Sequence, residues 1–205
     1  MMTLAPHLPD IAPMHDVVPT RWLAAAACTV DGEGIIWDGV EIGFHEMTTV
    51  AYATRSGTIN LVQRRVERRI HVTSTGRSLA IELATAPFGP RHEDHQRSIY
   101  GAVVEALHSV VEPRLCAELL REIAAGSVVN IGPLGVSGEG VRHQNIRRGP
   151  ALTWEQIPIA MLDGEDVTVV AAAPRLNDPA WVVDMIVPNA VLLPELLAEC
   201  AEAFC

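Results

Sequence analysis

A change of hydrophobic period between residues 66 and 110 constrains the fold more than any other feature of this sequence. Apolar and polar residues alternate through 66–73 and again through 79–83, on either side of a turn at 75–77. Such alternation is typical of half-buried strands, so the two runs predict a β-hairpin. After two prolines and a glycine in 87–90, apolar residues recur at the spacing of one helix face: Ile99, Val103, Ala106, Leu107 and Val110. A helix is therefore expected next, with Asp94 as its N-cap.

The rest of the chain repeats this order of strands followed by a helix. Pro113 fits the first turn of a further helical piece, which is expected to stop at Gly126. Strands are predicted at 48–55, 59–63, 128–131, 151–154, 157–162, 167–173 and 181–187. A closing helix is predicted to begin near Asn189, with one apolar stripe made of Leu193, Leu196, Leu197, Cys200 and Phe204. The pattern indicates an α+β fold.

Two short matches support an internal duplication. Residues 34–40 and 135–141 share the pattern Gly-aliphatic followed by acid-Gly-Val, at a displacement of 101 (135 − 34). Residues 44–47 and 154–157 share an aromatic followed three positions later by an aliphatic, at a displacement of 110 (154 − 44). The acid-Gly pairs are typical of turns, and the aromatic and aliphatic pairs are typical of core anchors. The sequence therefore predicts two related halves, the second with a longer loop in 142–150.

With these motifs, residues 30–204 resemble the bacterial pleckstrin-homology-like fold, in the tandem form of a functionally uncharacterised family from high-GC bacteria. The resemblance implies two strand meanders, each a partly open barrel closed by a C-terminal helix. The halves are expected at 21–126 and 127–205, after a Pro-rich N-terminal arm at 1–20. Such folds usually bind lipids, peptides or other proteins and are seldom enzymes. Phe44 and Met47 stand where the family pattern has Trp and Ile.

The charge of the chain argues against two classes of partner. The 205 residues carry a net charge of −10, and all 15 positive charges are arginines. A chain this acidic is repelled by nucleic-acid phosphates and by anionic bilayers, unless its arginines cluster. The four cysteines fit no zinc pattern, and no cofactor is expected. Because neither a secretory signal nor a membrane span is recognised, the cytoplasm is the expected location.

One such arginine cluster exists. Arg64, Arg65, Arg68 and Arg69 place four positive charges within six residues, opposed only by Glu67. In a pleckstrin-homology-like fold, basic strand and loop residues can grip phosphorylated head groups. The alternative interpretation is an exposed hairpin edge, charged to prevent strand-to-strand aggregation. Arg147 and Arg148 form a smaller version of the same feature.

Candidates for catalysis are sparse. His92, Glu93, Asp94 and His95 are the densest group of metal-ligand side chains. A metal site needs three or four ligands from a rigid frame, however, and these four are expected in a Pro-bounded loop that enters a helix. The alternative is a solvated loop entering a helix. Ser137 lacks the Gly-x-Ser-x-Gly spacing of a hydrolase nucleophile.

The sequence therefore favours a non-enzymatic binding or scaffold protein whose partner is another protein. Two alternatives remain. One is an anionic head-group binder that acts through the four arginines, and the other is a metal-dependent hydrolase centred on His92 and His95. The oligomeric state is not determined by the sequence.

Overall fold

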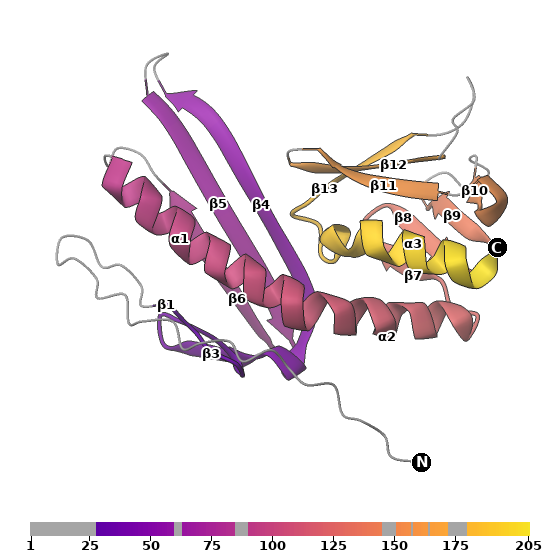
Figure 1. Cartoon of the computed structure of the whole chain (residues 1–205), viewed down its shortest axis with the longest axis horizontal. Helices are drawn as coiled ribbons and strands as arrows, with labels where there is room; N and C mark the ends of the chain where they lie inside the picture. The colour runs from indigo at the N-terminus through magenta and orange to yellow at the C-terminus, as the bar shows by residue number, and fades with distance from the viewer. Residues whose placement is uncertain are drawn as a thin grey trace.

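The computed structural model describes residues 28–59, 63–84, 90–144, 151–156, 158–163, 165–171 and 180–205. Within them the protein is a mixed α+β fold, with four small antiparallel sheets and helices packed against them (Figure 1). This confirms the α+β class expected from the sequence. The described strands form no closed barrel. The N-terminal arm predicted for residues 1–20 lies outside the described residues.

The first half contains two antiparallel meanders joined by one turn of 3₁₀ helix. The short meander consists of β1 (Cys28–Val30), β2 (Gly34–Trp37) and β3 (Val40–Gly43). The 3₁₀ turn η1 (Phe44–Glu46), anchored by buried Phe44, leads into the long meander. That meander consists of β4 (Met47–Ile59), β5 (Gln63–Ser74) and β6 (Arg77–Ala84).

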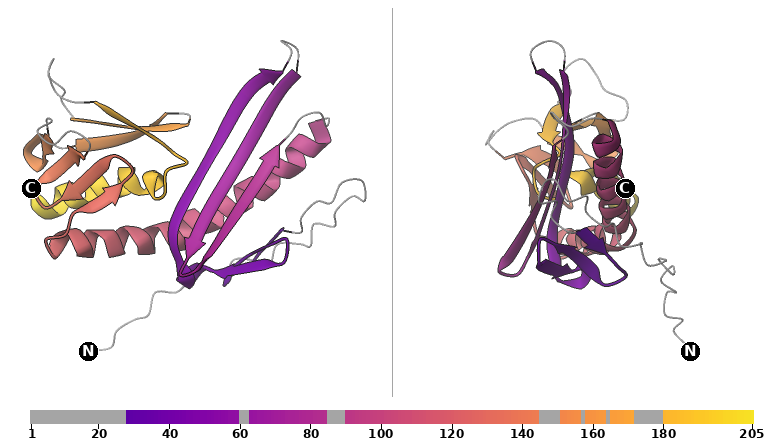
Figure 2. Two further views of the ribbon diagram at one scale, coloured as in Figure 1. Left: turned by 180° about the vertical axis from the view of Figure 1, so that it is seen from behind. Right: turned by 90° about the vertical axis from the view of Figure 1, so that its left-hand side faces the viewer.

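The hairpin predicted from the alternation is formed by β5 and β6. Val66, Ile70 and Val72 are buried on β5, as are Leu79, Ile81 and Leu83 on β6. The strand register pairs Ile70 with Ile81 and Val72 with Leu79, so these side chains share one face of the sheet. The long helix that follows covers this face (Figure 2). The hairpin prediction is therefore confirmed.

That helix is one continuous rod, where the sequence predicted two pieces. It consists of α1 (Pro90–Ala106), the π-helical turn η2 (Leu107–Val111) and α2 (Glu112–Ala124), with helical backbone angles at both joints. Pro113 lacks a backbone N–H, and its ring crowds the preceding turn, so the wider π turn accommodates it there. Gly126, at φ 88°, ends the rod as predicted. Because the rod begins at Pro90, Asp94 lies within the helix and the N-cap prediction is wrong.

The second half follows the same order. Its first sheet contains β7 (Val129–Ile131), β8 (Leu134–Ser137), β9 (Gly140–His143) and β10 (Ala151–Thr153). The 3₁₀ turn η3 (Trp154–Gln156) leads to β11 (Pro158–Asp163), β12 (Asp166–Ala171) and β13 (Trp181–Asp184). The chain closes with η4 (Ala190–Leu192) and α3 (Leu193–Phe204).

The two sequence matches behave differently in the structure. Phe44 and Trp154 are both buried, and each begins a 3₁₀ turn that leads into a three-stranded meander. The acid-Gly match is not equivalent. Asp38 and Gly39, at φ 50° and 78°, form the β2–β3 turn, whereas Gly140 is already the first residue of β9 and pairs with Ser137. The two halves therefore resemble each other in the order of their elements and in the buried aromatic residue that begins each 3₁₀ turn.

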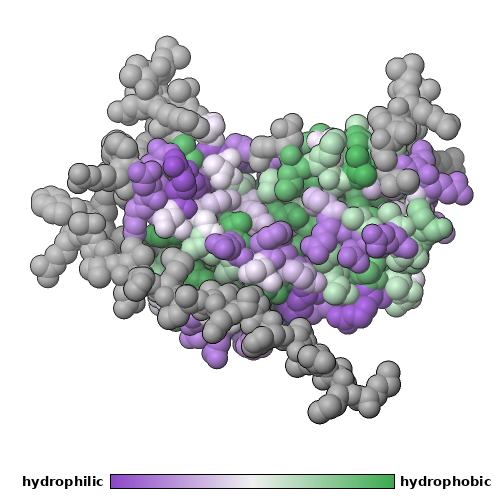
Figure 3. All heavy atoms as spheres, in the orientation of Figure 1, coloured by the Kyte–Doolittle hydropathy of each residue, from purple (hydrophilic) through white to green (hydrophobic). Residues whose placement is uncertain are grey.

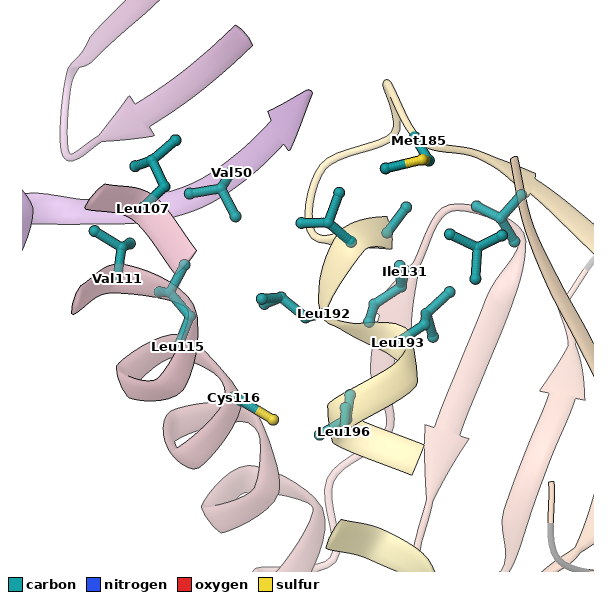
Figure 4. Packing of buried hydrophobic residues seen from close by; sticks show 14 of the residues in the cluster. Val50, Leu107, Val111, Leu115, Cys116, Ile131, Met185, Leu192, Leu193 and Leu196 are labelled. Atoms are coloured by element: carbon teal, nitrogen blue, oxygen red, sulfur yellow. The ribbon is translucent and has the colours of Figure 1, made fainter. Parts of the chain in front are cut away.

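One hydrophobic core runs through both halves. Figure 4 shows Cys116 of α2 pointing toward Leu196 of α3, and Leu192 pointing toward α2. A backbone junction supplements this packing. Val50 on β4 donates its N–H to Asn189 Oδ1 (3.0 Å), and the N–H of Asn189 donates to the Val50 carbonyl (2.7 Å). Asn189 thus pairs with the edge of β4 much as a strand residue would.

No helix in the described part of the chain combines the length and the apolar character needed to cross a bilayer.

Candidate functional site

The outer face of the β11–β12–β13 sheet is the strongest candidate for a functional surface. The inner face is built by alternation on β12, where Val167 and Val169 are fully buried beneath the sheet. α3 packs on this side, against β11. The remaining residues of the alternation point the other way, so their side chains form a second face.

This outer face consists of three cross-strand rows. Ile159 pairs with Val170, Met161 pairs with Thr168, and Thr168 pairs with Val182. Two residues further along each strand, Asp163 pairs with Asp166, and Asp166 pairs with Asp184. We call the set of these eight residues the outer face. It therefore has an apolar part and, beside it, a row of three aspartates.

The apolar part is unusually exposed for large hydrophobic residues. Met161 is 48% exposed and Val182 is 59% exposed, and the two residues lie in one cross-strand row, on either side of Thr168. Figure 3 shows hydrophobic residues at the surface in the upper part of the second half, where Figure 1 places β12 and β13. Isolated exposed hydrophobics are normal, as are Val40 on β3 and Val128 just before β7, but neighbouring ones on one face indicate an interaction surface.

The aspartate row is only partly neutralised. Asp184 Oδ2 accepts a hydrogen bond from Arg55 Nη2 (2.7 Å), and Arg55 also pairs with Glu165 (3.2 Å). Asp184 Oδ1 accepts a second bond from the N–H of Ile186, which turns the chain away and ends β13 before residue 187, where the predicted strand ended. Asp166 has no ion pair with any described residue.

Sequence reasoning missed this face. β11 and β12 are apolar at both parities, as in Ile159-Ala160-Met161 and Val169-Val170. A continuous apolar run reads as a strand buried on both sides, and only the tertiary position of α3 shows which side is open. The available signal was the alternation of Ile159, Met161 and Asp163.

The arginine cluster is divided by the sheet. Arg68 is 6% exposed and lies on the face covered by α1, where its Nη2 approaches Glu93 Oε1 at 3.9 Å and its Nη1 has no hydrogen-bond partner. Arg69 lies on the opposite face, within 3.3 Å of Glu67 and 3.8 Å of Glu82. The side chains of Arg64 and Arg65, and all of Arg147 and Arg148, lie outside the described residues. Arg68 and Arg69 are not brought together.

The group from His92 to His95 lies on α1, not in the loop that the sequence suggested. Glu93 accepts a hydrogen bond from Arg97 (3.0 Å), and Asp94 lies 3.6 Å from the same guanidinium. The side chain of His92 is outside the described set. Among the residues that the structure does describe, no group of three or more His, Cys, Asp or Glu could hold a metal ion.

A buried carboxylate occupies the junction of α2 and β4. Glu112, 4% exposed, accepts a hydrogen bond from the Tyr52 hydroxyl (2.6 Å) and lies 3.1 Å from His108 Nδ1. Burial, together with this bond to a carboxylate, raises the pKa of Tyr52 well above its ordinary value. Ser109, the nearest hydroxyl along the helix, donates to the Ala106 carbonyl. The network therefore ties the π turn to the sheet.

A hollow of about 440 Å³ lies between the β1–β2 turn, η1 and the π turn, lined by Gly32, Glu33, Phe44, His45, Val110 and Arg114. Arg114 donates to the carbonyls of Phe44 (3.1 Å) and Met47 (2.5 Å) and to Glu118 (2.8 Å). Its guanidinium thus fixes η1 against α2.

Comparison of the chain with protein-family models, with curated proteins and with solved structures gave no match, so the geometry of the outer face is what bears on function.

Proposed function

We propose that this protein is a non-enzymatic binding module that binds another protein through the outer face. The observation that carries the proposal is the exposure of Met161 and Val182 in one cross-strand row. Burying such side chains gives about 25 cal/mol per Å² of apolar surface removed from water. A partner that covers the face therefore gains affinity without any change in the core.

The charge of the surface favours protein over nucleic acid or lipid head groups as the partner. An apolar patch beside polar residues has the composition of a protein interface. The aspartate row and the net charge of −10 repel phosphates. Arg68 and Arg69 lie on opposite sides of their sheet, which argues against a shared head-group site.

At the level of fold, we propose that the halves at 21–126 and 127–205 are duplicated pleckstrin-homology-like units. Support comes from the shared order of short meander, 3₁₀ turn, three-stranded meander and helix. Buried Phe44 and Trp154 at the two 3₁₀ turns add to it. An experimental structure whose halves do not superpose strand for strand would contradict the duplication.

Site-specific photo-crosslinking tests the binding proposal. A photoreactive phenylalanine analogue at position 182 should yield crosslinks to a partner protein in cells that express the full chain. The same analogue at position 128 is the control, because Val128 is 58% exposed and Val182 is 59% exposed, but Val128 directly precedes β7 of another sheet. Crosslinking at 182 alone supports the proposal, and equal crosslinking or none at 182 contradicts it.

A further inference from the structure

The apolar part of the outer face continues directly into the aspartate row, and this continuity indicates the chemistry of the partner. We propose that the partner segment is a cationic amphipathic helix, with its apolar residues on Met161 and Val182 and a Lys or Arg on Asp166. This inference rests on the proposed function and specifies the partner at the same surface.

The electrostatics of the aspartate row favour a cationic partner. Like charges directly opposite on neighbouring strands destabilise a sheet. Here Asp166 pairs with an aspartate on each side, and Asp166 has no ion pair with any described residue, whereas Asp184 has one with Arg55. Asp166 is partly exposed, so a cation from a partner can reach it. Such a cation would relieve the repulsion between the aspartates.

The spacing of the two rows fits a helix. Residues two apart on a strand are about 6.6–6.8 Å apart, so this is the distance from the Met161–Val182 row to the aspartate row. Side chains one turn apart on a helix are separated by about 5.4 Å along its axis. The flexible stem of a Lys or Arg covers the difference. An apolar residue with a basic residue one turn away thus matches both rows.

A second copy of the chain does not fit this face as the partner. The inner face already carries a helix, α3, so a helix on the outer face would complete a three-layer arrangement. The exposed acids of α3 are Glu195, Glu199 and Glu202, and α3 has no basic residue. An isologous dimer through the outer face would place two aspartate rows in one interface, where they repel.

The test uses two capped synthetic peptides of about 14 residues, or about four helical turns, with the same amphipathic pattern. One contains only Leu and Lys, and the other only Leu and Glu. Titration of each into the full chain, followed by backbone amide NMR, gives affinity and location. We expect the Leu–Lys peptide to shift β11, β12 and β13 and to bind at least tenfold more tightly than the Leu–Glu peptide.

Two matched variants separate a local ion pair from general charge attraction. Asp166→Asn should weaken the Leu–Lys peptide two- to fivefold, about the value of one exposed ion pair. Glu202→Gln removes the same charge from α3 and should have no effect. Equal weakening by both variants, or absence of Leu–Lys binding at this face, would overturn the inference. Equal binding of both peptides at residue 182 would overturn the inference while leaving the proposed function intact.

Discussion

Replacing Leu196 with alanine tests whether α3 belongs to a core shared by both halves. The predicted stripe is confirmed at Leu193, Leu196, Leu197 and Cys200, each 0% exposed. Phe204 is only partly buried and stacks on Trp154 at a centroid distance of 6.1 Å. Leu196 faces Cys116 of α2, so its side chain lies where the two halves meet (Figure 4).

The expected cost follows from burial and from the rigidity of the surroundings. Truncating a core leucine costs about 2–5 kcal/mol, and the cost rises with the volume of cavity that remains. α3 packs against α2 on one side and β11 on the other. These elements are held by their own partners, which limits collapse into the cavity. We therefore expect about 3–5 kcal/mol, or a fall in Tm of roughly 6–20 °C for a chain of this length.

Urea unfolding followed by tryptophan fluorescence measures the loss, because Trp154 and Trp181 are buried in the second half. Hydrogen exchange of β4 and β5 amides reports on the first half. Glu199→Ala is the control, since Glu199 is exposed on the same helix and its replacement should change stability by less than about 0.5 kcal/mol. An unchanged midpoint for Leu196→Ala would refute the core assignment. Loss of protection confined to the second half would refute a shared core.

Two further predictions concern the thiols and the junction. Burial raises the pKa of Cys116 to about 12, and that of Cys28 and Cys200 to about 11, from an ordinary value of 9.0. The unfolded chain releases these protons first, so stability is complete below about pH 9 and falls above it, by about 1.4 kcal/mol per pH unit for each thiol. Denaturation midpoints between pH 9 and 11 should show this fall, and Cys116→Ala should make it shallower; an identical slope would contradict the assignment. Asn189 has φ 64°, so Asn189→Ala should cost about 2–3 kcal/mol through backbone strain and the lost bond to Val50. Asn189→Gly keeps the conformation and should cost less in thermal melts, whereas equal losses would mean that φ is unimportant there.

Local pattern was sufficient for much of the fold. The alternation through 66–83 identified the β5–β6 hairpin, because period-two burial is a property of the strand itself. The helical period identified the rod, and Gly126 its end, because capping depends on a few adjacent residues. The same alternation places Arg68 on the buried face of the strand, together with Val66 and Ile70. It therefore argues against one exposed surface that carries all four arginines.

Other features depend on residues far apart in the chain. The burial of Glu112 requires Tyr52, 60 residues away, and the bond between Val50 and Asn189 spans 139 residues. The exposure of Met161 and Val182 depends on which side of their sheet receives α3. A strand sequence that is apolar at both parities is compatible with burial of either face of the sheet. The sequence by itself thus determined the elements and their order, whereas only tertiary packing decided which apolar face stays in water, because burial is a property of the assembled layers.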